Sequence, residues 1–267
     1  MTRLITDWIC DMENSAAGWD RELKKLTGAG YREIGSMVSG WSAESISEAA
    51  ECEKVAVVPV TSGLGTLSTF AESVAAIVRA MGFETFVTEG TDVNGIYEAH
   101  VKDADIVFMA DDDRYIALNI RDGSIGDNNI ATASGYVEIL NKMAGEISGR
   151  KAAVLGYGII GQLMAQFLAD KGADVAVFDK NPDKKQSAIS DGYQWIDDSE
   201  ELRLYKYIAD GTSEGNWLSE DMLADDVLIA APGIPFSLTE TAQKKLEGRY
   251  VHDLLEIGTA GMLGLAI

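Results

Sequence analysis

The feature that most constrains the fold is the segment VLGYGIIGQ, residues 154–162. Its glycines, Gly156, Gly158 and Gly161, have the spacing G-x-G-x-x-G, and they stand between an apolar run typical of a buried strand and a segment with helical periodicity. A second predicted strand, DVAVFD, ends in Asp179, 23 residues after the first glycine. Strand, glycine-rich turn, helix, strand and acid in this order predict a dinucleotide-binding βαβ unit.

Each of these residues has a physical task in such a unit. Gly156 permits the tight turn, Gly158 lets a pyrophosphate approach the backbone, and Gly161 allows the helix to lie close to the strand. The helix N-terminus offers N–H donors and partial positive charge to the anion. Asp179 should accept hydrogen bonds from the adenosine ribose and repel a 2′-phosphate, so we expect NAD rather than NADP, although the neighbouring Lys180 tempers this preference. The alternative is a tight turn that binds no ligand.

Strands and short helices alternate through the second half of the chain, which predicts a doubly wound sheet of the Rossmann type. The loops after its later strands, ADGTSEG from residue 209 and APGIP from residue 231, should cover the rest of NAD, since ligands of open α/β sheets lie at the carboxyl ends of the strands. The residues predicted to bind the cofactor are Gly156, Tyr157, Gly158, Ile159, Ile160, Gly161, Asp179, Lys180, Gly211, Thr212, Pro232 and Gly233.

The first half of the chain predicts helices followed by a small parallel α/β unit. The β-branched run KVAVVPV, residues 54–60, is typical of a strand buried on both faces of a parallel sheet, and two further helix and strand pairs follow it. We therefore predict a two-domain α/β protein, with a substrate domain at residues 1–132 and a Rossmann domain at residues 133–267. A helix over residues 133–147 should join them, and YVHDLL, residues 250–255, is predicted as the last strand.

Charge and composition exclude several classes of partner. The chain has 22 basic and 43 acidic residues, so its net charge is −21, and this field would repel nucleic acids and anionic membranes. We expect a cytoplasmic protein, because no apolar run approaches the ~20 residues that span a bilayer and the N-terminus resembles no export signal. Cys10 and Cys52 lack the spacing of metal ligands, so no metal is predicted. The oligomeric state stays open, with a homodimer as one option.

Two polar loops follow predicted strands of the first domain. PVTSGLGT, residues 59–66, combines the hydroxyls of Thr61 and Ser62 with glycines that free backbone N–H groups. It is predicted to bind an anionic group, and a helix N-cap is the alternative. The second loop, MADDDRY at residues 109–115, contains three adjacent aspartates. We expect both loops to face the cofactor across a cleft between the domains.

The expected proton acceptor is a carboxylate rather than a histidine. His100 is predicted on a helix surface, and His252 is predicted as a packed, hydrogen-bonded residue of the last strand. A carboxylate near the nicotinamide suits a cationic amine substrate, which it attracts and whose proton it accepts. Among the three aspartates we expect Asp111 to face the substrate, with Asp112 or Asp113 capping the next helical turn.

The segments CEKVAVVPVTSGLGT, FMADDDRYIALNIRDGSIGDNN, APGIPFSLTE and IGTAGML together resemble the pyrrolysine synthase family. By position, the family's catalytic acid falls on Asp111, and its substrate-binding serine and asparagine fall on Ser62 and Asn128. The family carries a glutamate shortly before the last of these segments, and the aligned residue here is Asp253, with Glu256 three residues further on. Which of these two acids holds the substrate's amine stays open, and Thr61 completes the predicted substrate-binding set.

The resemblance implies an NAD-dependent oxidation of a lysine whose ε-nitrogen is acylated by 3-methyl-D-ornithine. The terminal carbon of the ornithyl group loses hydride, the α-amine closes a pyrroline ring, and ammonia leaves. One alternative is another NAD-dependent amine or amino-acid dehydrogenase. A second, of a different class, is a non-enzymatic NAD-binding redox sensor, which usually carries a DNA-binding module, and the sequence has no basic region to form one.

Overall fold

The computed structural model describes residues 4–67 and 69–267, and it divides into two compact units. Unit 1 comprises the chain up to Gly135 together with Leu254–Ile267, and unit 2 is Tyr136–Asp253. The helix α7 (Asn128–Ala144) begins in the first and ends in the second. The predicted Rossmann domain, residues 133–267, included the end of the chain, whereas Leu254–Ile267 belong to unit 1.

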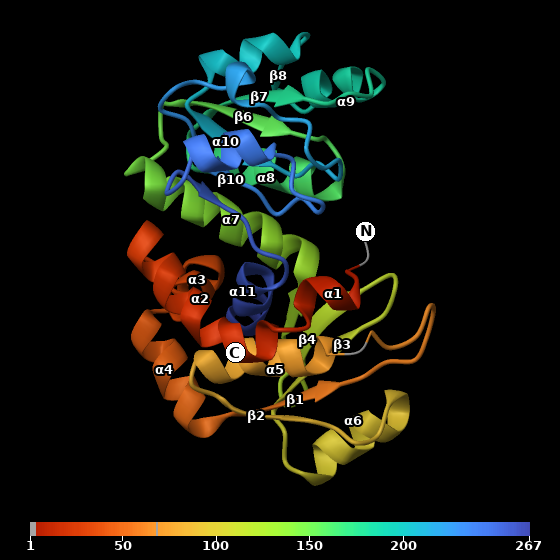
Figure 1. Cartoon of the computed structure of the whole chain (residues 1–267). Helices are drawn as coiled ribbons and strands as arrows, with labels where there is room; N and C mark the ends of the chain where they lie inside the picture. The colour runs from red at the N-terminus through yellow and green to blue at the C-terminus, as the bar shows by residue number, and fades with distance from the viewer. Residues whose placement is uncertain (1–3, 68) are drawn as a thin grey trace. The chain divides into compact units, whose positions relative to one another are not determined.

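The helices and strands of unit 1 are coloured from red to yellow-green, with its last helix in dark blue (Figure 1). The helices are α1 (Thr6–Ile9), α2 (Met12–Thr27), α3 (Tyr31–Ser39), α4 (Ala43–Cys52), α5 (Phe70–Ala80), α6 (Asp92–Val101) and α11 (Glu256–Ala266). The strands are β1 (Lys54–Val58), β2 (Glu84–Val87), β3 (Ile106–Ala110), β4 (Tyr115–Asn119) and β5 (Ile125–Asp127). The helix α3 lies between Gly30 and Gly40, within a glycine-rich stretch of the sequence.

The three predicted strands of unit 1 are parallel, as expected, and two further antiparallel strands that were not predicted make the sheet mixed. Its strand order is β2-β1-β3-β4-β5, with β1, β2 and β3 parallel and β4 and β5 antiparallel. The reversal follows a tight hairpin after β3, closed by a hydrogen bond of 2.8 Å from the N–H of Asp111 to the carbonyl of Arg114. The three aspartates therefore lead into a strand, and no helical turn follows them for Asp112 or Asp113 to cap.

The helix α11 corrects the prediction for the C-terminus. The predicted strand YVHDLL keeps only Tyr250–Val251 as β11, and α11 follows it. This helix is apolar around its circumference, so it must be surrounded by other elements, and its residues from Glu256 to Gly264 are all buried. It packs against α3, α5, β4 and β5, and a Cβ on Gly264 would lie 2.3 Å from the carbonyl oxygen of Gly35. Small residues therefore let α11 form the core of unit 1 (Figure 1).

Unit 2 is a Rossmann fold, as predicted. Its strands are β6 (Lys151–Leu155), β7 (Asp174–Phe178), β8 (Gln194–Trp195), β9 (Tyr207–Asp210), β10 (Leu228–Ala230) and β11. They form a parallel sheet in the order β8-β7-β6-β9-β10-β11, which places the topological switch point between β6 and β9. The helices are α8 (Ile159–Asp170), α9 (Lys184–Ser190) and α10 (Glu240–Lys245), with 3-10 turns η1 (Ser199–Leu204) and η2 (Glu220–Met222).

The two faces of this sheet are covered by different elements. The helix α8 packs on β6, β7 and β9. On the opposite face, Ala153, Leu155, Ile208 and Ile229 form a buried cluster with Ala242 of α10 and Leu246, which directly follows that helix. Across the described residues, no helix is long and apolar enough to cross a bilayer. Because β6, β7, β9 and β10 are parallel, their carboxyl ends lie at the same edge of the sheet, where ligands of such folds bind.

Candidate active site and cofactor-binding site

The fingerprint glycines lie between the end of β6 and the start of α8. Gly156 has a φ of +80°, and its N–H donates to the carbonyl of Phe178 at 2.8 Å. A Cβ on Gly161 would lie 1.7 Å from the carbonyl oxygen of Gly156, so α8 can approach the turn only because this residue is glycine. A Cβ on Gly158 would meet nothing within 4 Å. This open space stands at a helix N-terminus without a side-chain cap, which fits a pyrophosphate.

Asp179 lies at the end of β7, beside the fingerprint. Its Oδ2 accepts a hydrogen bond of 2.6 Å from the N–H of Tyr157, and its Oδ1 accepts one of 2.8 Å from the N–H of Asn181. Both oxygens are therefore oriented by backbone groups. A carboxylate held in this place has the chemistry expected of the ribose-binding acid.

The loops after β9 and β10 lie side by side over a buried acid. Asp210 is 1% exposed; its Oδ1 accepts from the N–H and the hydroxyl of Thr212 at 2.9 and 2.7 Å, and its Oδ2 accepts from the hydroxyl of Ser237. Burial raises the pKa of Asp210. A Cβ on Gly233 would lie 2.1 Å from the carbonyl oxygen of Thr212. The two loops that sequence predicted for the cofactor, with Gly211, Thr212, Pro232 and Gly233, are thus closely packed together.

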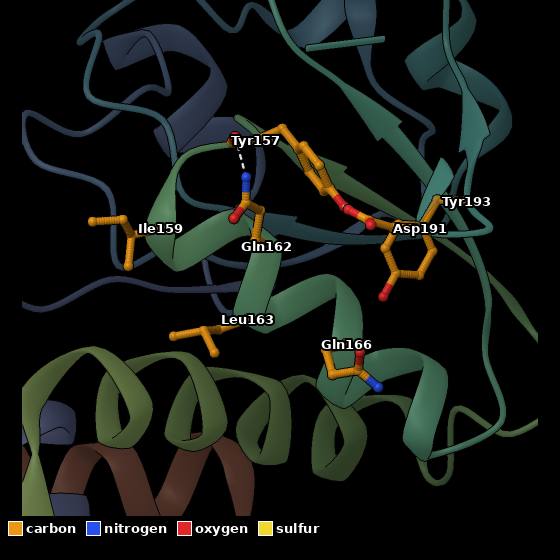
Figure 2. Close-up of a pocket in the computed structure, with 7 residues that line it drawn as sticks. All are labelled: Tyr157, Ile159, Gln162, Leu163, Gln166, Asp191 and Tyr193. Carbon is orange, nitrogen blue, oxygen red and sulfur yellow. Dashed lines mark hydrogen bonds between the residues drawn. The ribbon is translucent and has the colours of Figure 1, made fainter. Parts of the chain in front are cut away.

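A pocket of about 480 Å³ lies along α8 (Figure 2). It is lined by Tyr157, Ile159, Gln162, Leu163, Gln166, Asp191 and Tyr193. The Tyr157 hydroxyl donates to Asp191 Oδ2 at 2.7 Å, and Gln162 Nε2 donates to the Tyr157 carbonyl at 3.4 Å. Tyr157 therefore contributes to the fingerprint through its backbone, while its side chain belongs to this pocket.

In unit 1, the hairpin turn after β3 is organised by its aspartates. Asp111 Oδ1 accepts hydrogen bonds from the N–H groups of Asp113 and Arg114, at 2.8 and 2.7 Å. These bonds, with that from Arg114 the stronger, lower the pKa of the exposed Asp111 carboxyl. Its Oδ2 receives no hydrogen bond from the described residues. Asp112 Oδ2 accepts from the N–H of Leu64 at 2.7 Å, which joins the turn to the loop after β1.

The loop after β1 is held by carboxylates of the protein itself. The N–H and the hydroxyl of Thr61 donate to Asp92 at 2.8 and 2.5 Å. A Cβ on Gly63 would lie 2.1 Å from Asp112 Oδ2, so the loop packs directly on that carboxylate. Two of its N–H groups therefore already have anionic partners, whereas the exposed Ser62 keeps a hydroxyl that no described residue bonds.

The starts of α7 and α11 meet near this edge of unit 1. Asn128 Oδ1 accepts from the Thr132 hydroxyl at 3.1 Å, and a Cβ on Gly258 would lie 3.0 Å from that Oδ1 and 2.6 Å from Thr132 Oγ1. Arg114 of the hairpin turn pairs with Asp127, just before α7, at 3.3 Å. The hairpin turn, the start of α7 and the start of α11 are thus connected.

Glu256 is the first residue of α11, and its side chain is buried. The residue is 7% exposed, and Oε2 accepts from the N–H groups of Leu254 and Leu255 at 3.2 and 3.0 Å. Burial raises the pKa of its carboxyl. Thr259, one helical turn further on, bonds the Tyr115 hydroxyl at 2.9 Å, and Tyr115 directly follows the hairpin turn. Because residues i and i+3 share a helix face, Glu256 points toward the same side as this contact.

Asp253 and His252 belong to unit 2, and their contacts differ from those of Glu256. The Tyr136 hydroxyl donates to the Asp253 carbonyl at 3.1 Å and accepts from its N–H at 2.9 Å, both within unit 2. His252 Nδ1 lies 2.7 Å from the Ala231 carbonyl, its ring stacks on Phe236 with centroids 4.1 Å apart, and burial lowers its pKa. The prediction of a packed, hydrogen-bonded histidine is confirmed, although His252 follows β11 rather than lying in it.

Comparison with known proteins decides the family. The chain is 32% identical over 253 residues to pyrrolysine synthase of Methanosarcina acetivorans, covering 95% of this chain and 96% of that protein. It is 30% identical over 263 residues to pyrrolysine synthase of Methanosarcina barkeri, with 98% and 97% covered. The domain family described as "Pyrrolysine biosynthesis protein PylD, N-terminal domain" matches residues 11–126.

This chain belongs to the pyrrolysine synthase family. The family described as "NAD binding domain of 6-phosphogluconate dehydrogenase" matches residues 151–261, so this family member is an NAD-dependent oxidoreductase. In fold it is similar to shikimate 5-dehydrogenase of Thermus thermophilus, with a TM-score of 0.51, 15% identity, and 79% and 90% of the two chains covered. Shikimate dehydrogenase of Aquifex aeolicus gives a TM-score of 0.50 at 13% identity, with 80% and 90% covered.

Both acids that the sequence proposed for the substrate's amine are buried in this pyrrolysine synthase family member, Asp253 at 8% and Glu256 at 7% exposure. Glu256 is the first residue of α11. From Glu256 onward the sequence indicates this helix, because the residues that follow are small or apolar and none is charged. Such a segment is typical of a buried helix with one acid at its N-terminus.

Proposed function

We propose that this chain catalyses the last step of pyrrolysine formation. Its substrate would be Nε-(3-methyl-D-ornithyl)-L-lysine, whose terminal CH–NH₃⁺ group loses a proton and a hydride to become an imine. Attack by the α-amine of the same ornithyl group closes a five-membered ring, and loss of ammonia leaves the pyrroline C=N bond. The observation that carries the proposal is the similarity, over nearly the whole chain, to the pyrrolysine synthase of Methanosarcina acetivorans.

NAD supplies the hydride acceptor for this oxidation. The residues that would hold its pyrophosphate are the glycines of the fingerprint, with the open space beside Gly158, and the residue that would hold the ribose is Asp179. The packed loops with Gly211, Thr212, Pro232 and Gly233 would line the rest of the cofactor.

Two carboxyl groups of unit 1 divide the work on the amine. Backbone N–H groups stabilise the ionised form of Asp111, so it stays anionic and attracts an ammonium group through Oδ2. Burial favours the protonated form of Glu256, which makes it the better proton acceptor. Neutralising the reacting ammonium is necessary because a positively charged nitrogen opposes loss of hydride from the neighbouring carbon. We assign this proton transfer to Glu256 and the binding of the cation to Asp111.

The remaining polar groups of this edge would orient the substrate. Among the described residues, none bonds the Ser62 hydroxyl or the Asn128 amide N–H₂ group, which are therefore available to the substrate, and Thr61 holds the loop through Asp92. Ring closure joins two groups of one molecule, so correct orientation and exclusion of water contribute more than a strong nucleophile would. Asp253 is also buried and has its backbone bonded to Tyr136, and it is the alternative acid for the amine.

The assay for this function combines the purified chain, NAD⁺ and the methylornithyl-lysine dipeptide. We expect NADH absorbance at 340 nm to rise in step with ammonia release, and mass spectrometry to detect the cyclised product. Free amino acids serve as the comparison substrates. NADH formation with free amino acids but not with the dipeptide would indicate a different dehydrogenase. NAD binding without turnover of any amine would contradict catalysis altogether.

Asp111→Asn tests the cation-binding acid. The amide keeps an oxygen that can accept from Asp113 and Arg114, so the turn and the thermal midpoint should be preserved. Loss of the charge should raise KM for the dipeptide by about 10- to 100-fold, since hydrogen bonds to charged groups contribute roughly 1.5–3 kcal/mol. Asp113→Asn removes a neighbouring charge and is the matched control. Equal KM values for the wild type and Asp111→Asn would refute the assignment.

A further inference from the structure

Lys180 lies directly after the ribose-binding acid, where a basic residue could bind the 2′-phosphate of NADP. In the structure its ammonium is paired with the carboxylate of Glu214, from the loop after β9. Asp179 accepts one N–H on each of its oxygens, from Tyr157 and Asn181, which orients the carboxylate and leaves each oxygen a lone pair for the ribose hydroxyls. The pair therefore joins the loop after β7 to the loop after β9.

The position of Glu214 follows from how its loop is built. Thr212 is fixed to the buried Asp210 through both its N–H and its hydroxyl. On the other side of Glu214, Trp217 stacks on Phe178, the residue before Asp179, with ring centroids 6.0 Å apart and planes at 27°. The Trp217 indole also donates to Thr212 Oγ1 at 3.4 Å. Glu214 thus stands between two anchored residues of a loop held against the end of β7.

We propose that Glu214 is a specificity-determining residue for the cofactor, which selects NAD over NADP by occupying Lys180. With Glu214 in place, a 2′-phosphate meets two carboxylates, Asp179 and Glu214, and one lysine that already has a partner. Removing the charge of Glu214 leaves Lys180 free to pair with the phosphate and changes the local formal charge from −1 to zero. NAD carries a 2′-hydroxyl in place of this phosphate, so its binding does not require a free Lys180.

The expected size of the effect is modest, because both side chains are exposed, Lys180 at 76% and Glu214 at 52%. Exposed charges interact through solvent and salt screens them, so a change of one charge should alter affinity by about three- to tenfold at low ionic strength. The same exposure means that substitution should leave the fold intact.

The test measures binding of NADH and NADPH to the purified full chain by fluorescence titration at low salt, without substrate. We expect Glu214→Gln to lower the Kd for NADPH by about three- to tenfold and to change that for NADH by less than about twofold. Adding Lys180→Met to Glu214→Gln should abolish this gain. Asp226→Asn is the control, since it breaks an exposed pair with Lys206 at the amino ends of β9 and β10.

An unchanged ratio of NADPH to NADH affinity in Glu214→Gln would overturn the proposal, and so would a gain that survives in the double variant. A similar gain in Asp226→Asn would show a general charge effect and would also overturn it. Because no substrate is used, these outcomes are independent of whether the chain acts on the methylornithyl-lysine dipeptide.

Discussion

Replacing Glu256 with glutamine is expected to lower kcat for the dipeptide by about 10²- to 10⁴-fold, the usual contribution of a positioned general base. The two backbone N–H groups that bond Glu256 both donate to one oxygen, Oε2, so the amide oxygen of glutamine can accept them and preserve the start of α11. NAD affinity should be unchanged. Activity of Glu256→Gln within about threefold of the wild type would contradict the assignment of the base.

The pH dependence of kcat/KM provides a second test of Glu256 as the base. Because burial raises its pKa, the carboxyl binds a proton at pH values above its ordinary 4.5, and activity should fall as pH drops through this raised value. The wild-type profile of kcat/KM should therefore show an acid limb above pH 4.5 that Glu256→Gln lacks. A carboxyl with a raised pKa also costs stability as pH rises above 4.5, so Glu256→Gln should not be destabilised at neutral pH. Glu240→Gln, at the exposed first position of α10, is the matched control.

Alanine at Gly161 is expected to disrupt both the fold and cofactor binding. Its Cβ would lie 1.7 Å from the Gly156 carbonyl oxygen, which is backbone and cannot rotate away, so α8 must move off the turn. Overpacking of this kind costs about 1–3 kcal/mol or more in the free energy of unfolding. The displaced helix N-terminus should also lower NAD affinity by at least about tenfold, since charge-assisted hydrogen bonds to the pyrophosphate are lost.

Alanine at Gly158 separates these two effects. The residue has a φ of −83°, which alanine adopts readily, and its Cβ would meet no atom of the protein within 4 Å. The thermal midpoint of Gly158→Ala should equal that of the wild type, while the methyl group should obstruct the pyrophosphate and lower NAD affinity by about tenfold or more. Thermal denaturation and NAD titration of both variants make the comparison. Wild-type NAD affinity in Gly158→Ala would contradict the assignment of the open space to the pyrophosphate.

Sequence reasoning succeeded where structure is local. Gly156, Gly158, Gly161 and Asp179 stand on consecutive elements of one βαβ unit, so their spacing was enough to predict the Rossmann fold of unit 2. It failed where the outcome depended on strand pairing. The run of aspartates was read as the start of a helical turn, but the pairing of β3 with β4 makes it a hairpin.

By itself, the sequence determined the Rossmann unit, the NAD fingerprint and the likeness to pyrrolysine synthase, because each rests on neighbouring residues and their order. Only the tertiary structure decided that α11 returns to unit 1, that Glu256 is buried there, and that Glu214 engages Lys180. These features join residues distant in the chain, and their energies come from burial and charge pairing that no local spacing records.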